Sequence, residues 1–135
     1  MNVIFTLHTD GGARGNPGPS AIGGVLLDPS DEKIAEFSEF TGISTNNVAE
    51  YTALIKGLSI AFTNRARNLN CFLDSELVVK QLNGQYKVKS PGLKILFEKV
   101  IDLKNKFDSI SFTHIRRDKN FKADKLVNKA LDSFS

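Results

Sequence analysis

The sequence predicts an α/β fold in which helices cover a mixed sheet. Three extended segments come first, and a short polar link joins the second to the third, as is typical of an antiparallel meander. Extended and helical patterns then alternate, which is typical of parallel β–α units. The chain has 135 residues, of which 41% are hydrophobic and 24% are charged. These values suit one globular domain, so residues 1–135 are expected to form a single domain.

The first half of the chain contains the expected meander and a long helix. Residues 3–9 alternate polar and apolar side chains, which predicts a strand. The segment 10–19 is too rich in glycine and proline for regular structure. Residues 20–28 and 33–41 predict two more strands. Apolar side chains then recur at helical spacing over residues 51–62, which predicts an amphipathic helix.

The start of this helix allows two interpretations of Glu50. Thr45, Asn46 and Asn47 offer N-cap chemistry, and Glu50 lies three residues after Asn47, as in a capping box. In that case the Glu50 carboxylate would accept a hydrogen bond from a backbone N–H at the start of its own helix. Alternatively, Glu50 is a functional acid held in the first turn, beside the positive end of the helix dipole.

The second half of the chain predicts two more strands among three helices. Residues 69–73 form a short apolar strand, after which Ser75 can cap a helix that stops near Gly84. A basic loop precedes a helix over 93–107, and residues 110–115 predict the last strand. A final helix is expected to turn one set of side chains inward: Ala123, Leu126, Val127, Ala130, Leu131 and Phe134.

Four acidic residues lie where a predicted strand ends or a predicted helix begins, and they are Asp10, Glu50, Asp74 and Asp124. Open α/β folds present side chains to ligands from such junctions. Gathered together, these acids would repel, because two unit charges ~4 Å apart cost about 4 kcal/mol at an effective dielectric near 20. Asp10 could instead form a turn, and Asp74 could cap a helix. If the four acids do form a cluster, their carboxylate oxygens would favour Mg²⁺ or Mn²⁺ over zinc.

The net charge of +3 is unevenly distributed along the chain. Residues 1–79 contain 5 basic and 9 acidic side chains, whereas residues 80–135 contain 13 and 6. This asymmetry suits a polyanion held near metal-binding carboxylates, although a solvated lysine-rich surface would give the same counts. Cys71 is the single cysteine, so an intrachain disulfide is excluded and a reducing compartment is expected. Without a signal peptide or long apolar run, we expect a cytoplasmic protein, with no membrane partner.

Together these residues resemble ribonuclease H of type 1 over nearly the whole chain. The segments that carry the resemblance are Thr9–Pro19, Thr45–Tyr51, Leu73–Ser75 and His114–Asp124. The resemblance implies a ribonuclease H-like, five-stranded mixed sheet. It implies endonucleolytic hydrolysis of the RNA strand of RNA/DNA hybrids, which leaves 5′-phosphate and 3′-hydroxyl ends. It also makes Asp10, Glu50, Asp74 and Asp124 the ligands of two Mg²⁺ ions, with Mn²⁺ as a possible substitute.

Substrate contacts follow from the same resemblance. It places Gly11, Asn16, Asn46 and Asn47 against the minor groove of the hybrid, where 2′-hydroxyls distinguish RNA from DNA. Thr45 and Ser75 are expected to donate hydrogen bonds to the DNA strand or its phosphates. Some family members carry a long basic protrusion after the third acid, whereas this chain has a short loop with Lys87 and Lys89. That loop could still contact phosphates, with a stronger dependence on salt.

One auxiliary catalytic residue remains open between two candidates. His114 matches the family's loop histidine by its distance from Asp124, and a neutral imidazole could assist proton transfer. The segment after it is basic rather than glycine-rich, so Arg117 could supply the mobile cation instead.

The alternative function is a catalytically weak module of this fold that binds hybrids or double-stranded RNA. In either case we expect a monomer.

Overall fold

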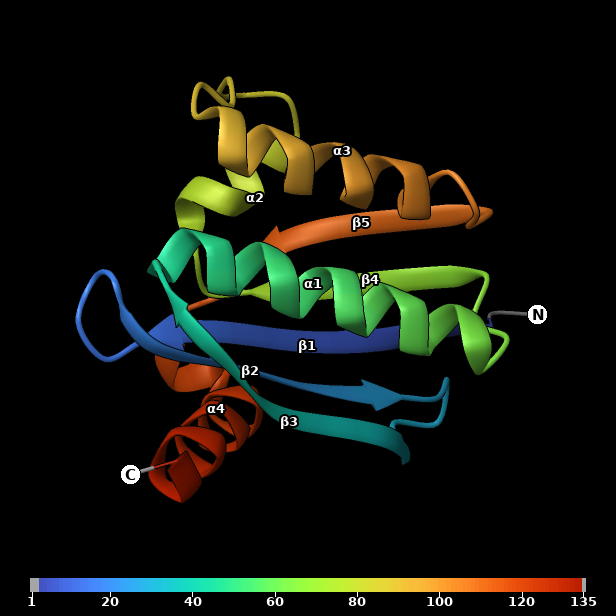
Figure 1. The fold of residues 1–135 in the computed structure, drawn as a ribbon. Coiled ribbons are helices and arrows are strands. Elements are labelled where there is room, and N and C mark those ends of the chain that lie inside the picture. The colour runs from blue at the N-terminus through green and yellow to red at the C-terminus, as the bar shows by residue number, and fades with distance from the viewer. Residues whose placement is uncertain (1–2, 135) are drawn as a thin grey trace.

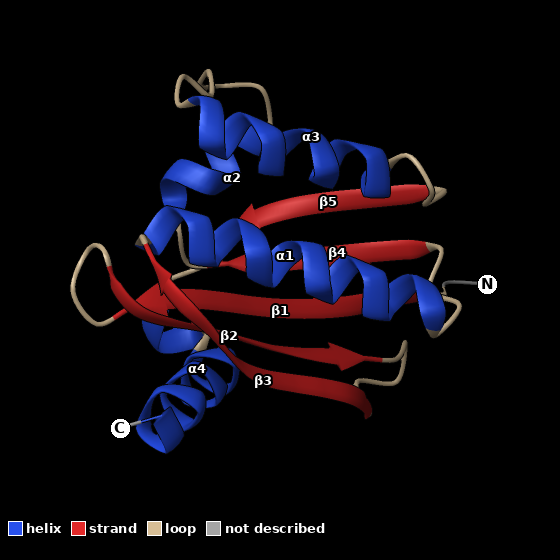
Figure 2. Ribbon diagram, viewed as in Figure 1, coloured by secondary structure: helices blue, strands red, loops and turns tan. Residues whose placement is uncertain are grey.

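The computed structural model describes residues 3–134, and its order of elements is the predicted one (Figures 1 and 2). The strands are β1 Ile4–Ala13, β2 Gly18–Leu27, β3 Lys33–Ser44, β4 Asn68–Leu73 and β5 Ser109–His114. The helices are α1 Asn46–Thr63, α2 Glu76–Leu82, α3 Pro91–Lys104 and α4 Phe121–Phe134, with a short 3₁₀ turn at Arg117–Lys119. None of the helices within residues 3–134 has the length and apolarity needed to cross a membrane.

The five strands form one mixed sheet in the order β3-β2-β1-β4-β5. β1 pairs antiparallel with β2, which pairs antiparallel with β3. On its other side β1 pairs parallel with β4, and β4 pairs parallel with β5. The predicted fold class is therefore confirmed, and β1 is the central strand from which both halves of the sheet extend.

Helices cover both faces of this sheet, and two neighbouring glycines of β1 identify which helix lies on which face. A Cβ atom added at Gly11 would meet the backbone of Ala49 in α1, whereas one added at Gly12 would approach Val127 in α4. Because successive residues of a strand point to opposite faces, α1 and α4 lie on opposite sides of β1. Figure 1 shows α1 in front of the sheet, with α2 and α3 beside it, and α4 below.

The main hydrophobic core lies between the sheet and α1–α3. It includes the fully buried side chains Leu7, Leu54, Leu58, Leu69, Cys71, Leu73, Val78 and Val100. A smaller cluster of Ala21, Val127, Ala130 and Leu131 fixes α4 against the opposite face. Both clusters follow the apolar periodicity of the sequence. The thiol of Cys71 is buried as expected, and burial raises its pKa far above the usual range.

Two predicted features of the strands and helices are wrong. The segment after Asp10 was expected to be irregular, but β1 continues to Ala13 and pairs with β2 through it. Asp10 therefore lies inside a strand, because glycine there permits close helix packing rather than a turn. Phe134, the last residue of α4, was expected to face inward. It is instead 55% exposed, and its ring stacks on Phe40 of β3.

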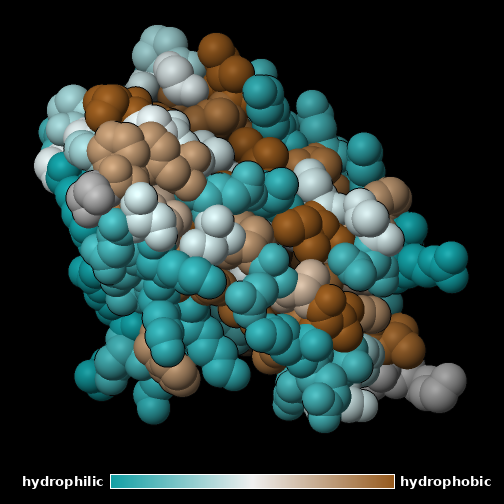
Figure 3. Space-filling model, turned by 60° about the horizontal axis from the view of Figure 1, so that its bottom comes forward, coloured by the Kyte–Doolittle hydropathy of each residue, from teal (hydrophilic) through white to brown (hydrophobic). Residues whose placement is uncertain are grey.

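Figure 3 shows a largely hydrophilic lower face on which hydrophobic residues form separate groups.

Candidate active site

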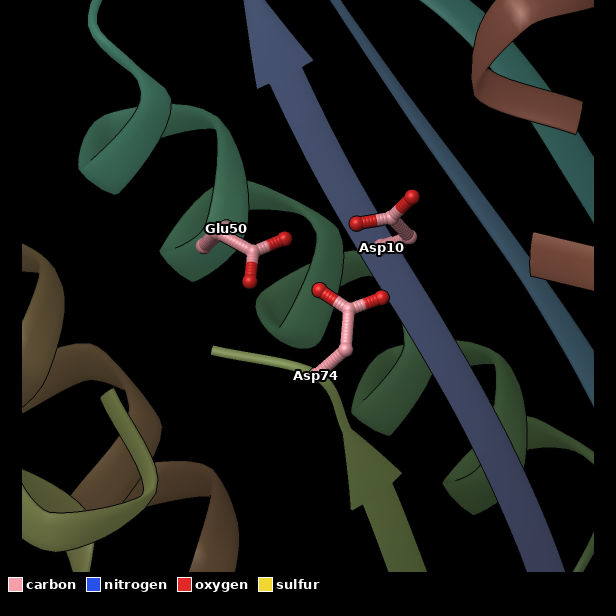
Figure 4. A group of neighbouring side chains, drawn as sticks. All are labelled: Asp10, Glu50 and Asp74. Carbon is pink, nitrogen blue, oxygen red and sulfur yellow. The ribbon is translucent and has the colours of Figure 1, made fainter. Parts of the chain in front are cut away.

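Three of the four predicted acids converge at one end of β1. Asp10 lies in β1, Glu50 in α1, and Asp74 directly after β4, so each comes from a different element. One carboxylate oxygen of each lies within 4.8 Å of the others, and Figure 4 shows the three carboxylates facing a common space. Parallel pairing of β1 and β4 places the ends of both strands at the same edge of the sheet, which explains this convergence.

The position of Glu50 depends on close contact between β1 and α1. The backbone N–H of Gly11 donates a hydrogen bond to Glu50 Oε1 at 2.5 Å. The capping-box interpretation of Glu50 is wrong, because Thr45 is the N-cap and its hydroxyl accepts from the Val48 N–H at 3.2 Å. Glu50 is thus held toward the other acids by the neighbouring strand.

Burial makes this cluster electrostatically unfavourable in its fully charged form. Desolvation, followed by the charge of Asp74, raises the pKa of Asp10 from 3.8 to about 7. Desolvation and the charge of Asp10 raise the pKa of Glu50 well above its usual value. A divalent cation would relieve both effects, because it neutralises the cluster and takes hard oxygen ligands. The donor set therefore fits Mg²⁺ or Mn²⁺.

Asp124 joins the same cavity from α4. Its carboxylate accepts hydrogen bonds from Arg117 Nη2 at 3.3 Å and from Asn128 Nδ2 at 3.4 Å. Asp124 also contributes to the raised pKa of Asp10, so the two side chains lie within electrostatic reach. The β1–β2 loop is fastened to this helix, since Arg14 forms a 2.7 Å ion pair with Asp132.

The acids line a cavity of about 400 Å³ together with several predicted substrate-binding residues. The lining includes Asp10, Gly11, Asn46, Asn47, Glu50, Asp74, Ser75, Arg117 and Asp124. Asn46 joins two segments beside it: its Oδ1 accepts from the Ala13 N–H at 2.8 Å, and its own N–H donates to Asn16 Oδ1 at 3.0 Å. Ser75 caps α2 by accepting from the Val78 N–H.

The remaining predicted residues are divided between this cavity and other sites. Among residues 3–134, the cavity lining includes Arg117 but not His114, which is the last, exposed residue of β5. Lys87 and Lys89 line a separate hollow of about 380 Å³ with the half-exposed Tyr86.

Asn120 is a buried polar residue of the site that sequence reasoning did not single out. Its side chain is 1% exposed, and Nδ2 donates to the Thr9 carbonyl at 2.9 Å and to Asp74 Oδ2 at 3.0 Å. Its Oδ1 lies 3.3 Å from Nδ1 of His8, which stacks on Phe72. In the sequence, Asn120 lies within the segment His114–Asp124 that resembles ribonuclease H, and this could have drawn attention to it. An asparagine after a charged loop, however, usually indicates only a helix cap.

The mixed sheet and the acids at its edge define a domain of the ribonuclease H class. Residues 8–130 match the family model described as reverse transcriptase-like. Ribonuclease HI of Halobacterium salinarum is 42% identical over 125 residues, which cover 93% of this chain and 63% of that protein. A bifunctional protein of Mycobacterium tuberculosis is 40% identical over 98% of this chain. The chain spans only 36% of that relative's length.

A solved structure gives the same result. LC11-RNase H1, isolated from compost by a metagenomic approach, has been solved in complex with an RNA/DNA hybrid. That complex superposes with a TM-score of 0.89 at 44% identity, covering 96% of this chain and 97% of the other. The chain belongs to the ribonuclease H family.

Proposed function

We propose that this domain hydrolyses the RNA strand of RNA/DNA hybrids endonucleolytically, with divalent cations held by Asp10, Glu50, Asp74 and Asp124. The observation that carries the proposal is the convergence of three carboxylates within 4.8 Å at a buried edge of the sheet. Named ribonuclease H relatives support the reaction class. A hybrid bound to LC11-RNase H1 supports the substrate.

The acids of this cavity would each have a defined task. Two divalent cations, Mg²⁺ in the first instance and Mn²⁺ as a substitute, would activate a water and stabilise the leaving oxygen. Asp10 is the best candidate to serve both ions, because it lies in the central strand and interacts with Glu50, Asp74 and Asp124. Gly11 fixes the Glu50 carboxylate through its N–H, so that ligand needs no reorganisation when a cation binds.

We assign the auxiliary role to Arg117 ahead of His114. The guanidinium of Arg117 is already at the cavity, and its side chain is 79% exposed, so it can turn toward a phosphate. His114 stands at the end of a strand and would have to act from outside the lining. In this assignment Arg117 leaves Asp124 when cations bind and then contacts the substrate phosphate.

Substrate recognition would extend along the cavity rim. Asn46 and Asn47 stand at the start of α1, and Asn16 is bonded to the backbone of Asn46. Together with Gly11 they offer amide and backbone groups that suit 2′-hydroxyls in a minor groove. Thr45 and Ser75 already cap α1 and α2, and the starts of both helices border the cavity, whose lining includes Asn46, Asn47 and Ser75.

Lys87 and Lys89 would contact phosphates outside the cavity. They belong to the loop between α2 and α3, and the shared hollow with Tyr86 places an aromatic ring beside them.

All four acids come from a single chain, so a monomer would be sufficient for the reaction. We also propose a cytoplasmic location, which is supported by the single, buried Cys71, because a free thiol suits a reducing compartment.

A cleavage assay on matched duplexes tests this function. RNA/DNA, RNA/RNA and DNA/DNA duplexes of one sequence are incubated with Mg²⁺, Mn²⁺ or a chelator. We expect cleavage confined to the RNA of the hybrid, lost with the chelator and lost in Asp74→Asn. Hybrid binding by the wild type without cleavage in either metal would favour a catalytically weak binding module instead.

A further inference from the structure

Asp74 differs from Glu50 in how its carboxylate is held. Glu50 is fixed by the backbone N–H of Gly11, which cannot rotate away. Asp74 lies after the end of β4, and Asn120 is the residue that reaches it, at 3.0 Å. Asn120 precedes α4 and comes from a distant part of the chain, so this contact also joins the fourth resembling segment to the third.

The orientation of the Asn120 amide is determined by its partners. The carbonyl of Thr9 can only accept hydrogen bonds, so the nitrogen Nδ2 must face it, at 2.9 Å. The same nitrogen supplies its second hydrogen to Asp74 Oδ2. The amide oxygen then faces Nδ1 of His8 at 3.3 Å, and it can only accept. Nδ1 of His8 must therefore carry the hydrogen and donate it.

We propose that His8 and Asn120 are positioning residues that orient Asp74 for cation binding, with His8 acting through the Asn120 amide. His8 is held for this task by its ring, which stacks on Phe72 with centroids 5.2 Å apart. Without the His8 donor, the amide oxygen of Asn120 loses its partner and the Asp74 carboxylate loses an oriented N–H. Groups that orient metal ligands in this way typically change affinity or activity by roughly 10- to 100-fold when removed.

This inference rests on the proposed function only for its cleavage measurement. The primary measurement is the affinity for Mg²⁺, which calorimetry determines in the absence of nucleic acid. His8→Phe keeps a ring to stack on Phe72 but removes the donor, whereas His8→Asn restores an N–H near the place of Nδ1. Asn120→Ala removes the whole bridge, and its folding is checked by thermal unfolding because Thr9 loses a buried partner.

The matched control is Asn70→Ala. Asn70 lies in β4 and accepts a hydrogen bond from Ser111 at 2.8 Å. It is half-buried like His8, and it is not among the described residues that line the acid cavity. This variant shows how much Mg²⁺ affinity and kcat fall when a hydrogen bond on the same sheet face is lost away from the acids.

We expect His8→Phe to weaken Mg²⁺ binding by roughly 10-fold and to lower kcat with little change in KM for the hybrid. His8→Asn should return both quantities to within about threefold of wild type, and Asn70→Ala should leave them unchanged. Wild-type Mg²⁺ affinity in His8→Phe, or an equal loss in Asn70→Ala, would overturn the inference. If wild type binds Mg²⁺ through this bridge but cleaves no hybrid, the proposed function fails while the positioning role stands.

Discussion

Gly11 and Glu50 are joined by a 2.5 Å hydrogen bond from a strand N–H to a helix carboxylate. The same glycine brings the two elements into contact, because a Cβ atom at Gly11 would lie 2.2 Å from the carbonyl oxygen of Ala49. The glycine is therefore required by the distance between β1 and α1. Its side-chain hydrogen is what allows the Glu50 carboxylate to approach Asp10.

Gly11→Ala should separate β1 from α1 and destabilise the domain by about 3 kcal/mol, as expected for an overpacked contact against backbone. Chemical denaturation with a chelator present measures this free energy of unfolding. The neighbouring Gly12→Ala is the control, because its Cβ would meet Val127 at an ordinary 3.9 Å. Equal stability of the two variants would show that β1 and α1 can separate without cost.

Asp10→Asn should abolish cleavage yet stabilise the cation-free protein at high pH. The raised pKa of Asp10, about 7, means that the folded protein holds this proton more tightly than the unfolded chain. This stabilising contribution is complete below pH 4 and is lost as the pH rises through 7. The wild-type free energy of unfolding, measured in chelator, should therefore fall between pH 5 and pH 8.

In Asp10→Asn this fall should be smaller, and the variant should exceed wild type at pH 8 by on the order of 1–3 kcal/mol. Mg²⁺ should reverse the order by stabilising the wild type alone, and more strongly at pH 8 than at pH 6, because cation binding displaces protons. Identical pH profiles of the two proteins in chelator would contradict the electrostatic account of the cluster.

Arg117→Ala should lower kcat more than His114→Ala does. Arg117 bonds to Asp124 at the cavity, whereas His114 ends an outer strand. We expect a loss of roughly 10- to 100-fold in Arg117→Ala, partly recovered in Arg117→Lys, and a loss under about threefold in His114→Ala. Single-turnover cleavage of a hybrid measures the chemical step directly. A larger effect of His114 would return the auxiliary role to that residue.

The double variant Lys87→Ala and Lys89→Ala should weaken hybrid binding at moderate salt. Each lost phosphate contact should reduce the slope of log affinity against log salt by about 0.9. Fluorescence anisotropy with Ca²⁺ or a chelator, at several salt concentrations, gives this slope without cleavage. Removing Lys104 and Lys106, at the other end of α3, is the charge-matched control. If both double variants lose the same affinity, only net charge matters.

The sequence predicted the elements well because each carries its own local pattern. Residues 69–73 and the helix after Ser75 have boundaries within two residues of those of β4 and α2. The segment after Asp10 failed because glycine has two uses, tight turns and close packing, and no local pattern separates them. Glu50 was ambiguous for a related reason, since a capping acid and a ligand have the same spacing along a helix.

Residues defined by distant contacts were the hardest to predict. Asn120 obtains its role from Thr9 and Asp74, and neither is near it in the chain. Phe134 fits the inward spacing of its helix, but at the last turn of α4 it meets only Phe40 of the edge strand β3 and stays 55% exposed. The convergence of Asp10, Glu50 and Asp74 could be predicted, because each lies at a junction of a strand or helix that reaches the same edge of the sheet. Their role as metal ligands stays a prediction.

The arrangement of α4 affects the order in which the site can assemble. Asp124 and Asn120 are in or next to the last helix, whereas Asp10 lies in the first strand. Contacts between such distant segments form late, after loop closure has been overcome. The carboxylate of Asp124 would therefore join those of Asp10, Glu50 and Asp74 only after α4 had packed on β2. A cation site built from all four acids would thus form only when both faces of the sheet are covered, so its occupancy reports the docking of α4 as well as the folding of the sheet.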